Sequence, residues 1–297
     1  MILFKKATDI HKYIDSQQKN GNSVGFIPTM GALHQGHISL VEMSKVSNQL
    51  TVCSIFINPT QFNDPKDFEK YPVTLEKDIA MLEAVGCDVL FLPAVIEMYP
   101  EAGTNILSLK GLLTAKHFEL GYLEEILEGK FRPGHFQGVC MIMQRLLEII
   151  LPDNLYLGQK DYQQCMVIRK LIDLIGLENT IKVTICPTLR ETDGLAMSSR
   201  NMRLNKKERK KASIIYQCLE LIRDNLQLES LSVLKTKASI LLNAEGFKID
   251  YIEIVDANTL SKISDTEFTG QYGKKKIVAL VAAFLNEVRL IDNMILN

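Results

Sequence analysis

The stretch VGFIPTMGALHQGHISLVEMSK, residues 24–45, joins a short apolar run to a helical pattern through a loop with two glycines and two histidines. The run at 24–27 predicts a buried strand, and the pattern at 38–45 predicts a helix. In a parallel sheet, ligands bind in the loops that follow the carboxyl ends of the strands. The stretch therefore predicts both a parallel α/β fold and the place of a site.

The rest of the chain repeats this alternation. Further strands are expected at 51–57, 88–92, 154–158 and 181–185, and amphipathic helices at 8–20, 74–86, 137–150 and 160–176. Such alternation predicts an α/β fold with a doubly wound parallel sheet. Near residue 190 the pattern changes to a charged stretch, a helical region and strands that read as antiparallel. We therefore predict a larger domain at 1–188 and a smaller α+β domain at 189–297.

Composition narrows the class of protein. A formal charge of −1 gives no reason to expect a nucleic-acid or anionic-membrane partner. The apolar run at 277–285 is too short to span a bilayer as a helix, and residues 1–10 do not read as a signal peptide. Six scattered cysteines without a CxxC pair predict reduced thiols in the core, and hence a cytoplasmic protein.

The opening loop is the first candidate site. Its glycines let backbone approach a ligand, and the start of the following helix offers N–H groups and a positive dipole end to an anion. His34 and His37 project from one side of the first turn, where two imidazoles suit a triphosphate attacked at its α-phosphorus. The pair could instead cap or pack the helix. Zinc is a third reading, although no Cys, Asp or Glu stands nearby at ligand spacing.

Two more candidate loops follow other strands. The amides of Asn58 and Gln61 both donate and accept, which suits a substrate with hydroxyl and carboxylate groups, although NPTQ is also a turn signal. In the stretch 156–164, Gly158 permits close approach and Lys160 supplies a point charge for phosphate. There Asp161 could accept from a ribose hydroxyl, Gln164 could face the same cleft, and simple helix capping remains an alternative.

The fourth candidate is RETDGLAMSSRN, residues 190–201, at the expected domain junction. Its two serines and Arg200, in a loop that contains Gly194, can surround a leaving pyrophosphate through charge-assisted hydrogen bonds. A loop in a hinge could close only when nucleotide is present. An ordinary linker would have a similar composition.

Taken in order, the motifs PTMGALHQGH, SIFINPTQF, FRPGHFQGV, LGQKDYQQ and RETDGLAMSSRN resemble the pantoate–β-alanine ligase family, the pantothenate synthetases. The first and last also resemble the histidine signature and the phosphate loop of the wider nucleotidyl-transferase superfamily. The resemblance continues into DYIEIVD and RLIDN, so it covers almost the whole chain. It implies a Rossmann-like domain, a small C-terminal lid and a homodimer that joins pantoate to β-alanine with ATP and magnesium.

The resemblance also implies site residues by position. The ATP site would comprise Met30, His34, Gly36, His37, Gly158, Lys160, Asp161, Leu189, Met197, Ser198, Ser199 and Arg200. Of these, His34, His37, Lys160 and Arg200 would be catalytic, because they would meet the charge that builds on the phosphoryl oxygens. Pantoate would be held by Gln61 and Gln164, with Asn58, Tyr71 and Arg132 nearby. Asp78 could reach magnesium through water.

Two departures from the family pattern stand out. The chain looks longer than usual between residues 112 and 125. The family pattern therefore does not predict the local structure of this segment or any dimer contact that it makes. Lys77 stands beside Asp78 at a position where a second acidic residue can occur. This departure weakens the expectation that Asp78 reaches magnesium through water.

Two other functions compete with ligation. A nucleotidyl transferase that stops after one displacement on a phosphate acceptor would need a basic acceptor site, whereas Gln61 and Gln164 are neutral. A non-catalytic nucleotide-binding regulator would not need Lys160 and Arg200, because sensing alone requires no transition-state charges.

Overall fold

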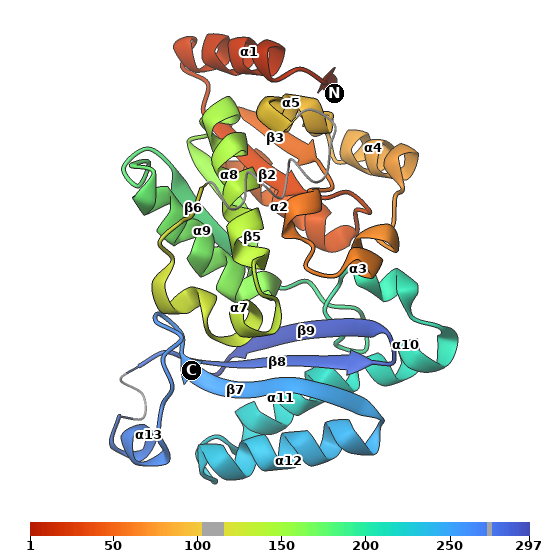
Figure 1. The fold of residues 1–297 in the computed structure, drawn as a ribbon, viewed down its shortest axis with the longest axis vertical. Coiled ribbons are helices and arrows are strands. Elements are labelled where there is room, and N and C mark those ends of the chain that lie inside the picture. Colours follow the sequence, from red (N-terminus) through yellow and green to blue (C-terminus); the bar gives the residue numbers. More distant parts are fainter. Residues whose placement is uncertain (103–115, 272–274) are drawn as a thin grey trace. The chain divides into compact units, whose positions relative to one another are not determined.

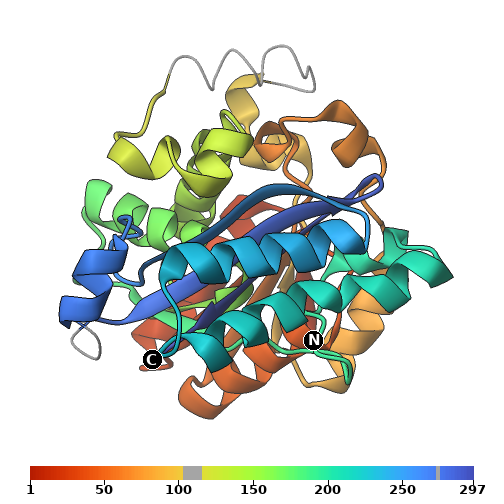
Figure 2. The same cartoon turned by 90° about the horizontal axis from the view of Figure 1, so that it is seen from below.

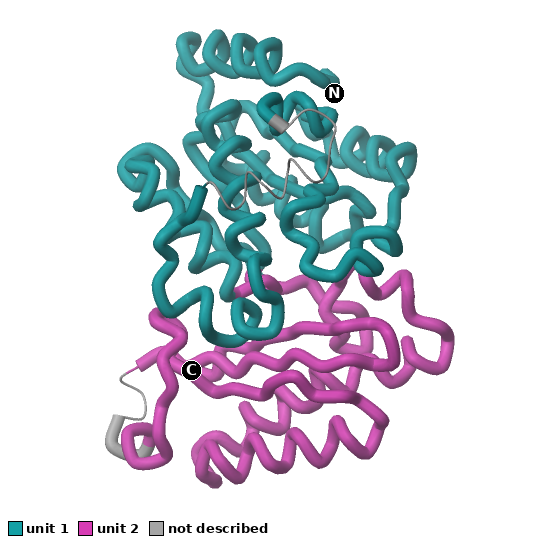
Figure 3. The backbone as a smooth tube through the Cα atoms, viewed as in Figure 1, with its two compact units in different colours: residues 1–158, 163–187 teal, residues 159–162, 188–297 magenta. Residues whose placement is uncertain are grey.

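The structure is a computed structural model, and it describes residues 1–102, 116–271 and 275–297. The chain divides into two compact units (Figure 3). The N-terminal unit comprises residues 1–158 and 163–187, and the C-terminal unit comprises residues 159–162 and 188–297. The short segment 159–162 thus belongs to the C-terminal unit, although the chain on both sides of it belongs to the other.

A six-stranded parallel sheet forms the centre of the N-terminal unit (Figure 1). Its strands in spatial order are β1 (Ile2–Phe4), β4 (Val89–Phe91), β3 (Leu50–Ile55), β2 (Val24–Thr29), β5 (Asn154–Gly158) and β6 (Lys182–Cys186). All the strands expected in this unit are present. β1 was not predicted, because it has three residues at the sheet edge and leaves Ile2 and Leu3 exposed.

The strand order places a switch point between β2 and β5. From β2 the chain proceeds to β3 and β4 on one side, whereas β5 and β6 extend the sheet on the other side. In doubly wound sheets the crevice at such a point, beyond the carboxyl ends of the strands, is where ligands bind. The loops after β2 and β5 therefore occupy the functional position of this fold.

Helices and 3-10 turns (η) follow the strands. They are α1 (Ala7–Lys19), α2 (Gln35–Ser47), η1 (Pro59–Gln61), α3 (Pro65–Glu69), α4 (Leu75–Ala84), α5 (Val95–Met98), η2 (Pro100–Ala102), η3 (Gly121–Glu124), α7 (Leu127–Phe131), α8 (His135–Ile150), η4 (Gln159–Asp161) and α9 (Tyr162–Leu174). On one face of the sheet, Ile27 and Cys53 pack against Val41 of α2 and Leu82 of α4. Neighbours that point the other way, such as Phe26, are also fully buried. Burial on both faces confirms the doubly wound α/β class.

The C-terminal unit contains a three-stranded antiparallel sheet in the order β7 (Phe247–Asp256), β8 (Ile277–Leu285) and β9 (Val288–Ile295). Two helices, α11 (Ile214–Asn225) and α12 (Leu231–Ala244), lie side by side along it (Figure 2). The smaller elements are η5 (Ser199–Arg203), α10 (Lys206–Ala212) and α13 (Asp265–Gln271). The predicted change to an α+β arrangement after residue 190 is confirmed.

The six cysteines are all buried, and each keeps its thiol rather than forming a disulfide. Burial raises the pKa of the Cys87 thiol to about 11 and that of Cys140 to about 12, so both stay protonated near neutral pH. They pack as small apolar residues, as the sequence indicated. In the described ranges, no helix has the length and apolar character needed to cross a bilayer.

Candidate functional site

The loop after β2 reverses the chain through two left-handed residues, Gly31 (φ 83°) and Ala32 (φ 48°). A Cβ at Gly31 would lie 3.1 Å from Oδ2 of Asp78 and 3.1 Å from the Ile55 side chain, so space and backbone conformation both favour glycine. The turn brings His34 to the N-cap of α2.

The carboxylate of Asp78, on α4, fixes this turn. It accepts hydrogen bonds from the N–H of Ala32 (2.8 Å), the N–H of Leu33 (2.8 Å) and the hydroxyl of Thr74 (2.9 Å). Asp78 is only 1% exposed. A buried carboxylate with these donors is a structural anchor, so the geometry gives Asp78 a role in shaping the histidine loop. Its contact with magnesium through water stays a prediction.

The two histidines are adjacent in space. The N–H of His34 donates to Nδ1 of His37 (3.3 Å), and the ring centroids lie 4.0 Å apart. Because Nδ1 accepts, the proton of a neutral His37 ring lies on Nε2, which makes that atom a donor. The first turn of α2 carries no acidic residue, so its positive dipole end is not offset there. Two imidazoles at this terminus form a credible anion site.

Gln61 lies at the end of η1, directly beside the histidine loop. Its Nε2 donates to Sδ of Met30 (2.8 Å), and its Oε1 accepts from Nδ2 of Asn58 (3.2 Å). Asn58 itself is 1% exposed and also bonds the backbone carbonyl of Gly138 (3.1 Å) and the hydroxyl of Tyr99 (2.8 Å). The structure therefore brings Met30 and Gln61 together, and it uses Asn58 to orient Gln61.

His135 was not assigned from the sequence, although FRPGH was among the motifs. Its Nδ1 donates to the backbone carbonyl of Gln61 (2.8 Å), and its Nε2 accepts from the Arg132 guanidinium (3.0 Å). Arg132 also lies 3.7 Å from the carboxylate of Glu128. At Gly138, one turn along α8, a Cβ would be 2.3 Å from the carbonyl of Thr60, so glycine permits α8 to pack against η1. The start of α8 thus holds both Gln61 and Arg132.

Three further predicted residues belong to the N-terminal unit. Tyr71 is buried with its ring edge-on to Phe62 (5.7 Å between centroids). Gln164 is half-buried near the start of α9. At Gly158, a Cβ would meet no heavy atom within 4 Å, which leaves open space in front of this backbone. A ligand at the end of β5 could use that space.

The segment predicted to be longer than usual is described from residue 116 to 125, and 112–115 lie outside the described residues. Two buried glutamines hold it. Gln137 of α8 bonds both the N–H and the carbonyl of Phe118 (2.9 Å each), and Gln163 of α9 donates to the carbonyls of Leu123 (2.8 Å) and Ile126 (3.0 Å). The segment is therefore pinned through its backbone.

In the C-terminal unit, residues 189–197 form a hairpin. The N–H of Met197 donates to the carbonyl of Leu189 (3.0 Å), Arg190 pairs with Ala196, and a turn closes at Gly194 (φ 88°). Leu189 is exposed, at 39%. The hairpin leads into η5, where the Ser198 hydroxyl accepts from the N–H of Arg200 (3.3 Å) and Ser199 is buried. The four residues 197–200 thus follow a defined turn.

Arg190 anchors the base of this hairpin. Its guanidinium makes a bidentate pair with the carboxylate of Asp292 (2.6 and 3.0 Å), donates to the carbonyl of Gly194 (3.0 Å) and stacks over the Tyr216 ring (4.4 Å to its centroid). Burial raises the pKa of Asp292, and the Arg190 guanidinium opposes that rise. Arg190 was quoted in a motif but received no role from the sequence.

Lys160 and Asp161 lie in η4, which also belongs to the C-terminal unit. The Lys160 ammonium is 3.4 Å from Oδ1 of Asp161, and the two side chains are 16% and 46% exposed. A partly buried lysine whose neighbouring carboxylate is exposed to solvent can form an ion pair with a phosphate that binds there.

Among the described residues, no three His, Cys, Asp or Glu side chains gather as a metal site. Mg²⁺ prefers octahedral oxygen ligands and commonly keeps several waters beside one or two carboxylates and a phosphate. Both oxygens of Asp78 already accept hydrogen bonds. These residues do not fit a protein-made magnesium cage.

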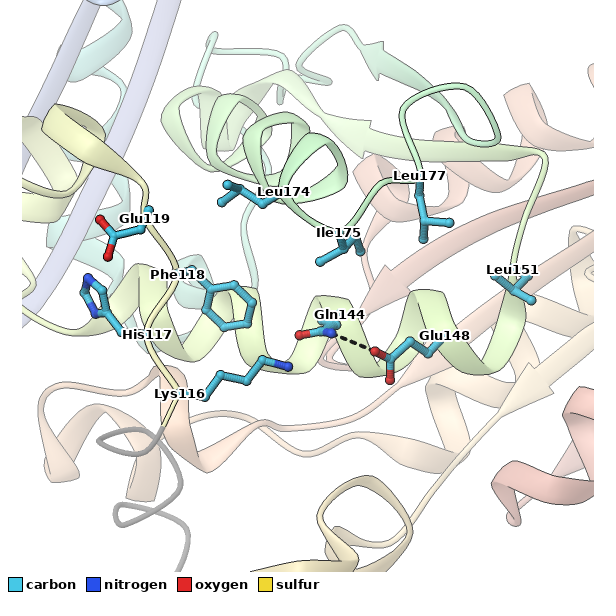
Figure 4. A pocket seen from close by; sticks show the side chains of 10 residues that line it. All are labelled: Lys116, His117, Phe118, Glu119, Gln144, Glu148, Leu151, Leu174, Ile175 and Leu177. Atoms are coloured by element: carbon cyan, nitrogen blue, oxygen red, sulfur yellow. Dashed lines mark hydrogen bonds between the residues drawn. The ribbon is translucent and has the colours of Figure 1, made fainter.

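A hollow of about 600 Å³ lies elsewhere on the N-terminal unit (Figure 4). Its lining includes Leu151, which precedes β5, and Leu174 and Leu177, which precede β6. It is therefore near the amino ends of these strands, whereas ligands of parallel sheets bind at the carboxyl ends. None of the predicted site residues lines it, so we favour the loops after β2 and β5 as the site.

Comparison with known proteins identifies the family to which this chain is similar. The family model described as pantoate-beta-alanine ligase matches residues 2–295. The pantothenate synthetase of Cytophaga hutchinsonii is 40% identical, over 100% of this chain and 99% of that protein. The crystal structure of pantothenate synthetase from Thermus thermophilus matches with a TM-score of 0.86 at 37% identity, over 99% of each chain. The Francisella tularensis pantoate-beta-alanine ligase, complexed with beta-gamma ATP and beta-alanine, matches with a TM-score of 0.79 at 36% identity, over 99% of this chain and 97% of that one.

The anchoring role of Asp78 predicts the effect of Asp78→Asn. The new NH₂ group would face a backbone N–H, so we expect the free energy of unfolding to fall by about 1–3 kcal/mol, with or without magnesium. Urea denaturation followed by circular dichroism measures this. The control is Glu76→Gln on the exposed side of α4, which should change stability by less than about 0.5 kcal/mol. Unchanged stability of the Asp78 variant, together with a higher magnesium requirement for activity, would favour the water-mediated metal role instead.

Proposed function

Because the chain belongs to the pantoate–β-alanine ligase family, we propose that it condenses (R)-pantoate with β-alanine, consuming ATP and producing pantothenate, AMP and pyrophosphate. The observation that carries the proposal is the match of this family over residues 2–295. The geometry supports it independently, because two imidazoles lie together at the start of α2 and the neutral amide of Gln61 is hydrogen-bonded to Met30 of the same loop.

The reaction begins with activation of the acid. A carboxylate is a poor acylating agent, so a carboxylate oxygen of pantoate attacks the α-phosphorus of ATP. The bond from that phosphorus to the bridging oxygen breaks, and pyrophosphate leaves with the bonding electron pair. The product is pantoyl adenylate, a mixed anhydride in which the acyl carbon carries a good leaving group.

We assign the N-terminal unit two tasks in this step. His34 and His37, at the start of α2, donate to phosphoryl oxygens whose negative charge grows during the attack. Gln61, held by Met30 and Asn58, and Gln164 bind the hydroxyl and carboxylate groups of pantoate. Tyr71 and Arg132 are assigned to the same substrate region, with Arg132 oriented by His135.

Further residues are assigned to the nucleotide. Lys160 and Arg200 supply positive charge, and the hydroxyls of Ser198 and Ser199 supply donors for the β and γ phosphates. Gly158, Asp161, Leu189 and Met197 are assigned to the adenosine part, and Gly36 to close backbone contact with phosphate.

The second step joins the amine to the activated acid. The amine of β-alanine attacks the acyl carbon of the adenylate, an amide bond forms, and AMP leaves from the same carbon. Since water could attack that carbon as well, the adenylate must be shielded from solvent until the amine arrives.

Three further parts of the proposal rest on the sequence resemblance. Magnesium is proposed only as the ion that ATP carries on its phosphates, because the described residues do not fit a protein-made cage. The chain is proposed to form a homodimer, which light scattering after size-exclusion chromatography tests. A cytoplasmic location is proposed, and six buried thiols support it.

The two-step scheme predicts that the half-reactions separate. Pantoate with Mg-ATP, but without β-alanine, should release pyrophosphate in a burst of about one per active site, since a shielded anhydride is not hydrolysed. Adding β-alanine should then release AMP and pantothenate together. Gln164→Ala should weaken the use of pantoate and leave ATP binding nearly unchanged. Rapid-quench analysis of the nucleotides measures the burst. The appearance of ADP would rule out the adenylate, because ADP implies attack at the γ-phosphorus.

The assigned cations and imidazoles predict a second result. His37→Ala and Lys160→Ala should each lower the rate of the adenylation step by about 10²–10³, because their contacts strengthen in the transition state. Binding of ATP, measured by calorimetry, should weaken far less. Lys207→Ala, on the exposed surface of α10, is the control and should react like the unmodified protein. Equal losses in binding and rate would assign the two side chains to ground-state binding only.

A further inference from the structure

The turn that carries Lys160 is held by one buried side chain of the last strand. Nδ2 of Asn293, on β9, donates to the backbone carbonyls of Gln159 (3.0 Å) and Lys160 (2.8 Å). Its Oδ1 accepts from Nε2 of Gln159 (3.2 Å). Asn293 is 1% exposed, so both donors and the acceptor of this amide are committed to residues 159 and 160.

The preceding residue of β9 holds the other phosphate-binding segment. The Asp292 carboxylate pairs with Arg190 at the base of the hairpin 189–197, and the carbonyl of Asn293 accepts a further hydrogen bond from that guanidinium (3.2 Å). Two adjacent residues of one strand therefore fix the turn of Lys160 and the loop that leads to Arg200. All of these residues belong to the C-terminal unit.

The turn itself is short, and α9 begins directly after it. η4 has three residues, and 3-10 turns have poorer hydrogen-bond geometry than α-helices. The backbone of the turn sets the position from which the Lys160 side chain starts and the direction in which it leaves the chain. The ammonium must nevertheless reach a phosphoryl oxygen within hydrogen-bond distance, and a displacement of about 1 Å can cost about 10²-fold in rate.

We propose that Asn293 is a positioning residue for Lys160, setting the backbone from which the ammonium reaches the reacting phosphate. The inference rests on the proposed function, since it concerns the adenylation step. Asn293 itself touches no substrate in this scheme, and it acts through the lysine.

A double-mutant cycle tests the inference. Asn293→Asp is close in size and keeps the acceptor, but an ionised carboxylate loses both donors to the turn. Asn293→Ala removes the whole amide. Each should lower the rate of pyrophosphate release from pantoate and Mg-ATP by about 10–100-fold, with little change in the KM for pantoate. In the Lys160→Ala background, the same changes should alter the rate less than about twofold, because a positioning effect disappears with the group it positions.

A matched control separates positioning from general loss of stability. Asp250 of β7 forms an ion pair with Arg289 of β9 (2.7 Å), so Asp250→Asn disturbs the same sheet at another place. This variant should have nearly the unmodified rate in both backgrounds. All rates are measured well below the unfolding temperature of each variant, and hydrogen exchange at 159–162 should rise in the Asn293 variants only.

The outcomes distinguish failure of the proposed function from failure of the positioning inference. If the unmodified protein releases no pyrophosphate, the proposed function fails. If it does and Lys160→Ala impairs it, but the Asn293 variants lose the same factor with and without Lys160, the positioning inference alone is wrong. Full activity of both Asn293 variants would overturn it equally. If Asn293→Ala does not fold, the cycle is read from Asn293→Asp.

Discussion

The hydrogen bonds from the N–H groups of Ala32 and Leu33 to the buried carboxylate of Asp78 decide where the first functional loop ends and α2 begins. The loop contains two left-handed residues, and at Ala32, which unlike Gly31 carries a Cβ, this conformation costs free energy and persists only where the surroundings hold it. Asp78 supplies that hold from α4, in a different part of the chain. Because α2 starts where this turn ends, the direction of its dipole and the pairing of His34 with His37 both depend on the same carboxylate.

Buried amides likewise fix the backbone of other candidate segments and of the segment 116–128. Loops at strand ends contain N–H and C=O groups that no neighbouring strand satisfies, and a buried group without a partner is costly. Asn58 orients η1, Gln137 and Gln163 hold the segment 116–128, and Asn293 holds η4. An amide can both donate and accept without carrying a charge. These side chains can therefore be buried at lower cost than acids or bases in the same places.

The sequence predicted the parts of the fold that depend on local pattern. Apolar runs located β2 to β6, and amphipathic periodicity located α1, α4, α8 and α9, with ends that differ by a few residues. β1 was missed because three residues at an edge have no period, and the short helices α3, α5 and α7 have too few turns to show one.

The candidate site was predictable only in part. The histidine loop and the loop of Gln61 follow strand ends, so the rule for parallel sheets located them. Arg190 and Asn293 received no role because the side chains or carbonyls that they hold are distant in the chain; Arg190 and Asp292, for example, are 102 positions apart. The bond from His135 to the carbonyl of Gln61 is likewise long-range, although its other partner, Arg132, is only three positions away. Nothing in the local sequence indicates such a pairing. For Asp78 and Asn58 the sequence identified residues of interest, but only the structure reveals how completely their polar atoms are engaged inside the protein.

The four residues 159–162 give the C-terminal unit a discontinuous sequence, and this has a consequence for how such proteins can be recombined. A chimera of two relatives joined once, after residue 187, would combine the η4 segment of one parent with the β9 strand of the other. The amide of Asn293 would then meet a foreign turn, and the fit between them would depend on the two parents having diverged little. Exchange of the C-terminal unit as a working module requires three junctions, so that the tetrapeptide travels with 188–297. In evolution the same constraint would couple substitutions in the tetrapeptide to substitutions near the end of the chain.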